Sequence, residues 1–239
     1  MADCQIILYG AGSQNPFCNA SPNDNIAAGG KTISIVLVGG PCGGKSSCHE
    51  ILKEGIENSS RMKVICVPEN ATPIFKSFGG FDPAWCGTEK VVQVQKMLLR
   101  AQLHQEEIAT LSSELFVGPS VIIYDRGTLD GKTFCTPEEW KKVTQDSGFS
   151  DEDLLGRYDL VVHLESVACF KEDATLYVYG EGSNNESRFH TPEEAAENDV
   201  LAGTIYKSHK KYRKFKNKKT FEEKIDDVKK YVLDELKHI

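Results

Sequence analysis

The chain has 239 residues, of which 40% are hydrophobic, enough apolar side chains to bury the core of one large α/β domain. Its formal net charge of −7 excludes a protein that binds nucleic acid through a generally basic surface. Its eight cysteines form no C-x-x-C pair or zinc-type cluster, and the sequence shows no secretory signal and no apolar run of membrane-spanning length, so we expect free thiols in a cytoplasmic protein without a transmembrane segment.

Residues 1–30 are expected to form a flexible N-terminal extension. A short apolar run at residues 5–9 has the composition of a strand, and a stretch rich in Gly, Asn, Ser and Pro follows it. Regular structure is predicted to begin near Lys31, so the predicted domain spans residues 31–239.

The first strand of this domain is predicted at residues 32–38, where the β-branched sequence TISIVLV is typical of a buried strand. Directly after it, residues 39–46 read GGPCGGKS and match G-x-x-x-x-G-K-[ST], the phosphate-binding P-loop. A helix is predicted from Lys45 onward. Strand, glycine loop and helix N-terminus therefore follow one another in the order that phosphate binding requires.

The residue types of this loop suit a nucleoside triphosphate with Mg²⁺. Glycines let backbone N–H groups curl around phosphate oxygens. Lys45 would reach the β- and γ-phosphates, Ser46 would ligate Mg²⁺, and Ser47 would donate to the α-phosphate. The predicted nucleotide-binding residues of the loop are Gly39, Gly40, Pro41, Cys42, Gly43, Gly44, Lys45, Ser46 and Ser47.

A second strand is predicted at residues 62–67, and Glu69 follows it. A carboxylate at this place would accept the proton of an acceptor hydroxyl or orient that hydroxyl. The alternative is an acid that stabilises a helix N-terminus. After a glycine- and aromatic-rich loop at residues 78–87, apolar residues at helical spacing predict a buried helix over residues 90–108.

A third strand is predicted at residues 121–124, with Asp125 and Arg126 directly after it. Asp125 would hold Mg²⁺ opposite Ser46, and Arg126 would stabilise the transferring phosphate or bind the acceptor. The alternative is a surface turn with an ion pair. The P-loop favours the functional interpretation, because both segments would meet at the same edge of the sheet.

The second half of the chain is predicted to add strands at residues 158–164 and 212–215. Between them, the irregular residues 166–192 are interpreted as a lid, with a small hairpin expected at residues 175–179. Arg188 is the candidate that would close over the phosphates, because lids of phosphoryl-transfer enzymes bring arginines to them. The alternative is an ordinary surface loop.

Ser or Thr followed three residues later by an acid is typical of a helix N-cap. This pattern predicts helix starts at Thr136, Ser150, Thr191 and Thr220. We expect the helix after Thr191 to run towards Lys211. The face of the last helix is predicted to be Phe221, Ile225, Val228 and Val232.

Residues 207–219 hold eight Lys and Arg residues in thirteen positions. The favoured interpretation is a solvated face, and the alternative is a surface that attracts an anionic lipid or a protein partner. Asn217 in this run is a candidate nucleotide-binding residue. It does not complete the N-K-x-D guanine motif, because Thr220 stands in place of the aspartate.

Strands alternate with helices along the whole domain, which predicts a three-layer α/β fold with a parallel sheet between helices. In such sheets, ligands bind at the carboxyl ends of the strands. The P-loop, Glu69 and Asp125 all lie at such ends, so they are expected to share one site.

Several segments resemble a known family. Residues 67–71 (VPENA) resemble the V-P-E-x-A segment of nucleoside-kinase-like P-loop proteins, whose matching glutamate acts as base on the acceptor hydroxyl. Residues 125–131 (DRGTLDG) resemble the D-R-G-x-x-D motif of the AAA-type P-loop family that includes the kinase domain of NadR and the translocation-defect proteins. Further similarity covers residues 157–159, 185–195 and 221–224.

The resemblance implies a kinase-like P-loop domain with a five-stranded sheet in the order 2-3-1-4-5. It implies that residues 39–47 bind nucleotide and Mg²⁺, with Asp125 nearby. NadR-like proteins phosphorylate nicotinamide riboside, and a translocation-defect protein binds anionic lipids and acts in trafficking. The resemblance by itself carries neither property over to this chain.

Two functions therefore remain open. The first is a Mg²⁺-dependent phosphotransferase that moves the γ-phosphate of ATP, or of GTP, to a small hydroxyl acceptor, with Lys45, Asp125, Arg126, Glu69 and Arg188 as catalytic residues. The second is a regulatory or trafficking protein that binds ATP or GTP, hydrolyses it slowly, and has a protein or lipid partner.

Overall fold

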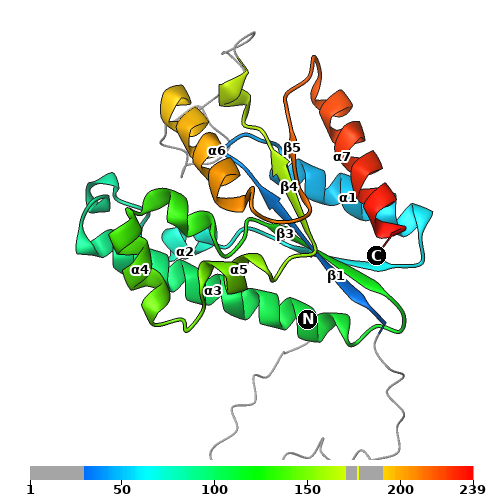
Figure 1. The fold of residues 1–239 in the computed structure, drawn as a ribbon, viewed down its shortest axis with the longest axis horizontal. Helices are drawn as coiled ribbons and strands as arrows, with labels where there is room; N and C mark the ends of the chain where they lie inside the picture. Colours follow the sequence, from blue (N-terminus) through cyan, green and yellow to red (C-terminus); the bar gives the residue numbers. More distant parts are fainter. Residues whose placement is uncertain (1–29, 171–176, 178–190, 239) are drawn as a thin grey trace, which may run out of the picture.

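The computed structural model describes residues 30–170, 177 and 191–238 (Figure 1). The expected N-terminal extension and its apolar run lie outside the described residues, as does the hairpin predicted at residues 175–179 apart from Tyr177. Within the described ranges, no helix combines the length and apolar character needed to cross a bilayer.

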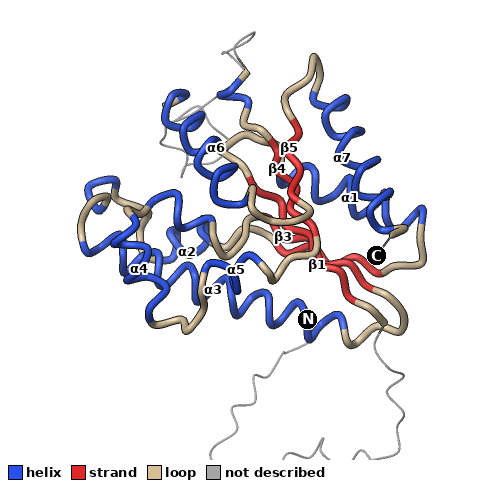
Figure 2. Tube along the Cα trace, viewed as in Figure 1, coloured by secondary structure: helices blue, strands red, loops and turns tan. Residues whose placement is uncertain are grey.

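A five-stranded parallel sheet forms the centre of the fold (Figure 2). Its order, β2-β3-β1-β4-β5, confirms the predicted fold class. The strands are β1 (Thr32–Val38), β2 (Lys63–Val67), β3 (Ser120–Asp125), β4 (Leu160–Leu164) and β5 (Tyr212–Phe215). The register pairs Leu37 of β1 with Asp125 of β3, and Val38 with His163 of β4. The carboxyl ends of these central strands therefore meet beside the P-loop.

Helices cover both faces of this sheet (Figures 1 and 2). The α-helices are α1 (Lys45–Ser59), α2 (Ala71–Ser77), α3 (Glu89–Ser113), α4 (Pro137–Gln145), α5 (Asp151–Leu155), α6 (Pro192–Tyr206) and α7 (Phe221–Leu236). Short 3₁₀ helices are η1 (Pro83–Trp85), η2 (Asp130–Phe134) and η3 (Val167–Cys169). The predicted N-caps are confirmed, since the side chains of Thr136, Ser150, Thr191 and Thr220 each accept a hydrogen bond from the backbone N–H three residues on.

The two faces of β1 pack into two separate hydrophobic cores. Ile35 and Leu37 pack against α1 and α7, with Leu52 and Val228 as partners. Val36 on the opposite face packs into the cluster formed by α3, α4, α5 and α6. Because both faces are covered, the strand is apolar at nearly every position instead of alternating, which is typical of parallel sheets.

Two local predictions were wrong, and one short helix was not predicted. Helix α6 ends at Tyr206 and does not continue towards Lys211, because the buried His209 turns the chain there: its N–H bonds to the Tyr206 carbonyl and its Nε2 lies 2.8 Å from the Tyr158 carbonyl oxygen. Helix α2 was not predicted; it is short and has no buried residue, so it has no periodic apolar signal. Phe221 is 38% exposed and does not join the buried face of α7.

Candidate nucleotide-binding site

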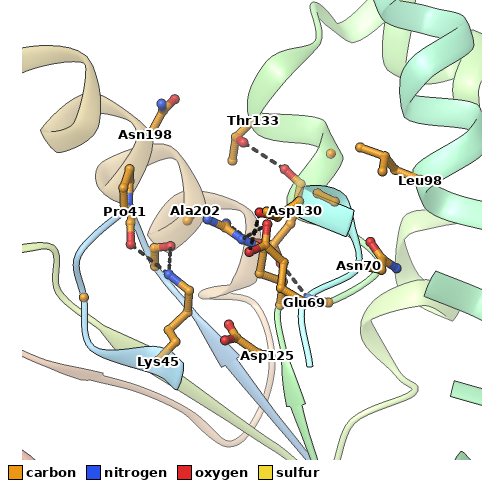
Figure 3. Close-up of a pocket in the computed structure, with 18 of the residues that line it drawn as sticks. Pro41, Lys45, Glu69, Asn70, Leu98, Asp125, Asp130, Thr133, Asn198 and Ala202 are labelled. Carbon is orange, nitrogen blue, oxygen red and sulfur yellow. Dashed lines mark hydrogen bonds and ion pairs between the residues drawn. The ribbon is translucent and has the colours of Figure 1, made fainter. Parts of the chain in front are cut away.

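A cavity of about 630 Å³ opens at the carboxyl ends of β1, β2 and β3. Its walls include every P-loop residue from Gly39 to Ser47, together with Glu69, Asp125 and Arg126. In Figure 3, Lys45 and Asp125 lie near each other at the base, Asn198 and Ala202 of α6 lie on the P-loop side, and Leu98 lies on the opposite side. The structure thus brings together residues from three strand ends that the sequence placed at one edge.

The P-loop backbone requires glycine at specific positions. Gly39 has φ +124°, and a Cβ there would lie 2.2 Å from the carbonyl oxygen of Leu164. Gly44 has φ +88° and forms the N-cap of α1. Cys42 adopts φ +55°, a left-handed conformation that is strained for a residue with a side chain. Such strain is typical of loops shaped for a ligand.

Lys45 is held against the loop that it follows. Its Nζ donates to the carbonyl oxygens of Gly39, at 3.0 Å, and Gly40, at 2.8 Å. Burial of the side chain and, to a smaller extent, the charge of Arg126 lower the pKa of Lys45 from 10.5 to about 8, although Asp125 and neighbouring acids oppose the shift. The ammonium group is therefore desolvated and aimed at the loop, as phosphate binding requires.

Other carbonyls of the loop are bound from outside. Ser166 Oγ donates to the Pro41 carbonyl at 2.5 Å, and Lys224 Nζ of α7 donates to the Gly43 carbonyl at 3.0 Å. The first backbone N–H groups of α1 have no intrahelical acceptor, as at every helix start. The loop therefore presents donors and a helix N-terminus to the cavity, which is the arrangement that binds anions.

Ser46 donates a hydrogen bond to Asp125, with Ser46 Oγ 2.7 Å from Asp125 Oδ2. The described residues hold no cluster of three or more His, Cys, Asp or Glu side chains suited to a metal. One hydroxyl and one carboxylate fit Mg²⁺, which takes few protein ligands and completes its shell with water and phosphate oxygens.

Arg126 adopts φ +74° and is fixed by two acids. Its Nε lies 3.5 Å from Glu69 Oε1, and its Nη1 lies 3.2 Å from Asp130 Oδ1. Burial alone would lower the pKa of Arg126, but the carboxylates of Glu69, Asp130 and Asp125 outweigh burial and raise it. The guanidinium stays charged, and Arg126 lines the cavity.

Asp130 shapes the turn that carries Arg126, a role that sequence reasoning missed. Its Oδ2 accepts hydrogen bonds from the Gly127 N–H, at 2.7 Å, and from the Tyr206 hydroxyl, at 2.9 Å. The signal for this role in the sequence was the position of Asp130 four residues after Arg126.

The far side of the cavity combines aromatic rings with buried amides. Phe75 and Phe81 lie with ring centroids 5.2 Å apart and both line the cavity. Gln95 and Gln102 of α3 are almost fully buried, and Gln95 Oε1 has no hydrogen-bond partner among the described residues. Sequence reasoning missed this compartment, although two glutamines seven residues apart on an apolar helix face were a signal.

Of the two remaining predicted site residues, only Asn217 is placed by the structure. Arg188 lies outside the described residues. Asn217 does not line the cavity; its Nδ2 donates to the carbonyl of Ser166 at 2.8 Å, and its Oδ1 accepts from Lys224 at 3.1 Å. Asn217 therefore fastens the chain after β5 to the end of β4 and to α7.

The basic run at residues 207–219 is only partly a solvated face. Lys214 bonds to Asp199 at 2.8 Å and to Glu165 at 3.2 Å. Lys218 pairs with Asp227 at 2.8 Å. Acids from neighbouring elements therefore neutralise part of the run.

Comparisons with known proteins agree with this geometry. The profile of a family described as "AAA domain" matches residues 34–224. No curated protein was found to match the sequence. Among solved structures, the chain is similar to deoxyadenosine kinase from M. mycoides with bound dATP, at 15% identity and a TM-score of 0.50, over 84% of this chain and 98% of that chain. That likeness shows the fold. The chain therefore belongs to this AAA-domain family and is a nucleotide-binding P-loop protein with the fold of a nucleoside kinase.

Proposed function

We propose that the protein is a Mg²⁺-dependent phosphotransferase that moves the γ-phosphate of ATP to a hydroxyl of a small acceptor. The observation that carries this proposal is the two-part cavity: the P-loop forms one part, and the compartment of Phe75, Phe81, Gln95 and Gln102 forms the other. A simple hydrolase needs only the first part. The domain of residues 31–239 would work in the cytoplasm, with residues 1–30 as an extension.

The charged groups between the two parts suit phosphoryl transfer. Lys45 and Arg126 would neutralise the γ-phosphate as it moves, and Ser46 and Asp125 would hold Mg²⁺, which supplies further neutralisation of phosphate charge when bound. The acceptor oxygen forms its bond to the γ-phosphorus while the bond to the bridging oxygen of ADP breaks. The hydroxyl proton passes to a Glu69 carboxylate oxygen, and ADP leaves.

Three further residues have proposed roles, which rest on the sequence for Arg188 and Ser47 and on a structural contact for Asn217. Arg188 would close over the phosphates from a lid at residues 166–192, and Ser47 would donate to the α-phosphate. Asn217 would act on the nucleotide only indirectly, through its bond to Lys224. ATP is favoured over GTP because residues 217–220 do not complete the guanine motif.

The proposal is tested by nucleotide consumption across a panel of nucleosides that includes nicotinamide riboside, with ATP and with GTP. One acceptor is expected to raise turnover well above the background rate. Glu69→Gln is expected to lower the acceptor-dependent rate by roughly 100-fold or more, whereas Glu54→Gln, an exposed acid on α1, leaves it unchanged. No stimulation by any acceptor would contradict the proposal.

A second candidate is a regulatory nucleotide-binding protein with slow hydrolysis and a lipid or protein partner. The observation that favours it is a separate cavity of about 570 Å³ between β5 and α7, lined by Arg213, Lys216 and Lys230 among others. The Arg213 guanidinium lies over the Tyr231 ring, 4.9 Å from its centroid. This candidate predicts slow ATP or GTP hydrolysis that no small acceptor stimulates.

A further inference from the structure

A buried carboxylate joins α6 to the P-loop. Asp199 of α6 has a side chain with no exposed surface. Its Oδ1 accepts hydrogen bonds from the N–H of Gly40 at 3.0 Å and the N–H of Ser166 at 2.9 Å, and lies 3.0 Å from His163 Nε2. Its Oδ2 accepts from Lys214 Nζ at 2.8 Å. One acid thus bonds to the P-loop, β4, the N-cap of η3 and β5.

This carboxylate is ionised. Burial alone would raise the pKa of Asp199, but the hydrogen bonds from His163, Lys214 and Gly40 outweigh burial and hold the pKa well below its usual range. Because an ionised carboxylate only accepts, His163 donates through Nε2. Its Nδ1 lies 2.6 Å from the Tyr212 hydroxyl, which fixes the ring.

The hydrogen bond to Gly40 matters because of the peptide unit to which it belongs. The Gly40 N–H and the Gly39 carbonyl are the two polar groups of one planar peptide. Lys45 Nζ bonds to the carbonyl oxygen at 3.0 Å, and Asp199 bonds to the N–H at 3.0 Å. The peptide is therefore held at both ends, and Asp199 sets the orientation of a carbonyl that positions the Lys45 ammonium.

Packing leaves this contact little freedom. A Cβ added to Gly40 would lie 2.9 Å from the Ala195 carbonyl oxygen and 3.0 Å from Asp199 Cβ, so α6 lies directly against the loop. The residue before Asp199, Asn198, lines the main cavity, as does Ala202 one turn later (Figure 3). The same stretch of α6 thus faces both the cavity and the loop.

We propose that Asp199 is a positioning residue that couples α6 to the P-loop. Binding of a nucleoside triphosphate at the loop then fixes the position of α6. In turn, the position of α6 sets the affinity of the loop for the triphosphate. The inference rests on nucleotide binding and is independent of phosphoryl transfer. Coupling of this kind is reciprocal. Loss of the Asp199 carboxylate weakens nucleotide binding, and it also removes the effect of nucleotide on α6.

The test compares the wild-type chain, Asp199→Asn and a matched control. The control is Asp159→Asn, since Asp159 Oδ2 also accepts a backbone N–H, that of Ser34 at 2.8 Å, on β1 away from the P-loop. Two quantities are measured at low temperature on the full chain: the Kd for a fluorescent ATP analogue with Mg²⁺, and amide hydrogen exchange of residues 192–206 with and without that nucleotide.

In the wild type, nucleotide is expected to slow exchange in residues 192–206 by about fivefold or more. Asp199→Asn is expected to raise Kd by about tenfold or more and to remove this protection, while Asp159→Asn keeps both within about twofold of wild type. Equal Kd values for the two variants would overturn the inference. If Asp199→Asn does not fold, unchanged exchange in wild-type α6 on nucleotide binding would overturn it independently. A wild type that binds no nucleotide would overturn the nucleotide-binding function, and the inference with it.

Discussion

Ser46 of α1 donates a hydrogen bond of 2.7 Å to Asp125 of β3, and this contact joins the start of the first helix to the end of a neighbouring strand. The two residues are 79 positions apart in the sequence. They meet because β1 and β3 are adjacent and parallel, so the segments that follow them emerge side by side.

Because Ser46 and Asp125 would hold Mg²⁺, we predict that part of the affinity for nucleotide depends on this ion. Ser46→Ala removes the hydroxyl that would ligate the ion, so we expect the enhancement of nucleotide affinity by Mg²⁺ to fall by at least about tenfold, while affinity without Mg²⁺ stays near wild type. Titration calorimetry with and without Mg²⁺ measures both. Ser112→Ala, on the exposed end of α3, is the control and should behave as wild type. An unchanged Mg²⁺ effect in Ser46→Ala would contradict the assignment.

We predict that the buried Lys45 side chain lowers the stability of the nucleotide-free chain and that nucleotide binding requires it. Its pKa of about 8, against 10.5 in water, means that burying the charged form costs about 3 kcal/mol at neutral pH. Lys45→Met removes this cost but leaves the Gly39 and Gly40 carbonyls without their donor. We expect a net rise of about 1 kcal/mol in the free energy of unfolding of the nucleotide-free chain.

The same variant should bind nucleotide at least about 100-fold more weakly, because a charge-assisted bond to phosphate is lost. Denaturant titration and nucleotide titration test the two effects separately. Lys53→Met, elsewhere on α1, is the control for adding an apolar side chain. A Lys45→Met protein that is less stable than wild type, or that binds equally well, would contradict this account.

Nucleotide affinity should fall as pH rises through 8. Only the ammonium form of Lys45 attracts phosphate, and its pKa of about 8 means that the protonated fraction drops from about 0.9 at pH 7 to about 0.1 at pH 9. Kd at pH 9 is therefore expected to be about tenfold higher than at pH 7. Lys45→Arg, whose side chain stays charged, should give a nearly flat profile. A sloping profile in Lys45→Arg would assign the titration to another group, such as Lys224, whose buried side chain also has a pKa lowered to about 8.

Gly44 and Phe221 should be energetically coupled. Gly44 has φ +88°, and a Cβ there would lie 2.3 Å from Cε2 of the Phe221 ring. Gly44→Ala is expected to cost about 1–2 kcal/mol from the left-handed backbone, plus a steric contribution. Phe221→Ala removes only the steric part, so a double-mutant cycle should give a coupling of about 1 kcal/mol. Purely additive effects would show that the ring moves aside without cost.

The elements that the sequence predicted best are those whose signals are local. The strands, the glycine loop and the N-caps depend on short patterns, and the parallel arrangement then brings Glu69, Asp125 and Lys45 to one cavity. Asp199 could not be found in this way. Its role arises only when α6 folds against Gly40, 159 residues earlier in the chain, and its own neighbourhood in the sequence is an ordinary helix surface.

For Phe221, in contrast, the sequence held a local signal, and the prediction from it was wrong. Its spacing from Ile225 and Val228 fits a buried helical face, and those two residues are buried. Phe221 is the first residue of α7, however, and its ring lies against the P-loop at Gly44. Periodicity describes the middle of a helix and says little about the direction of its first turn.

The proposal of phosphoryl transfer is tested most directly by the fate of a labelled γ-phosphate. The full chain is incubated with γ-³²P-ATP, Mg²⁺ and the panel of nucleosides, and the products are separated. We predict that one nucleoside acquires the label in wild type and in Glu54→Gln, and that Lys45→Met and Glu69→Gln lose this transfer. Label that appears only as inorganic phosphate, at the same rate with and without every acceptor, would contradict phosphoryl transfer and favour the regulatory nucleotide-binding function.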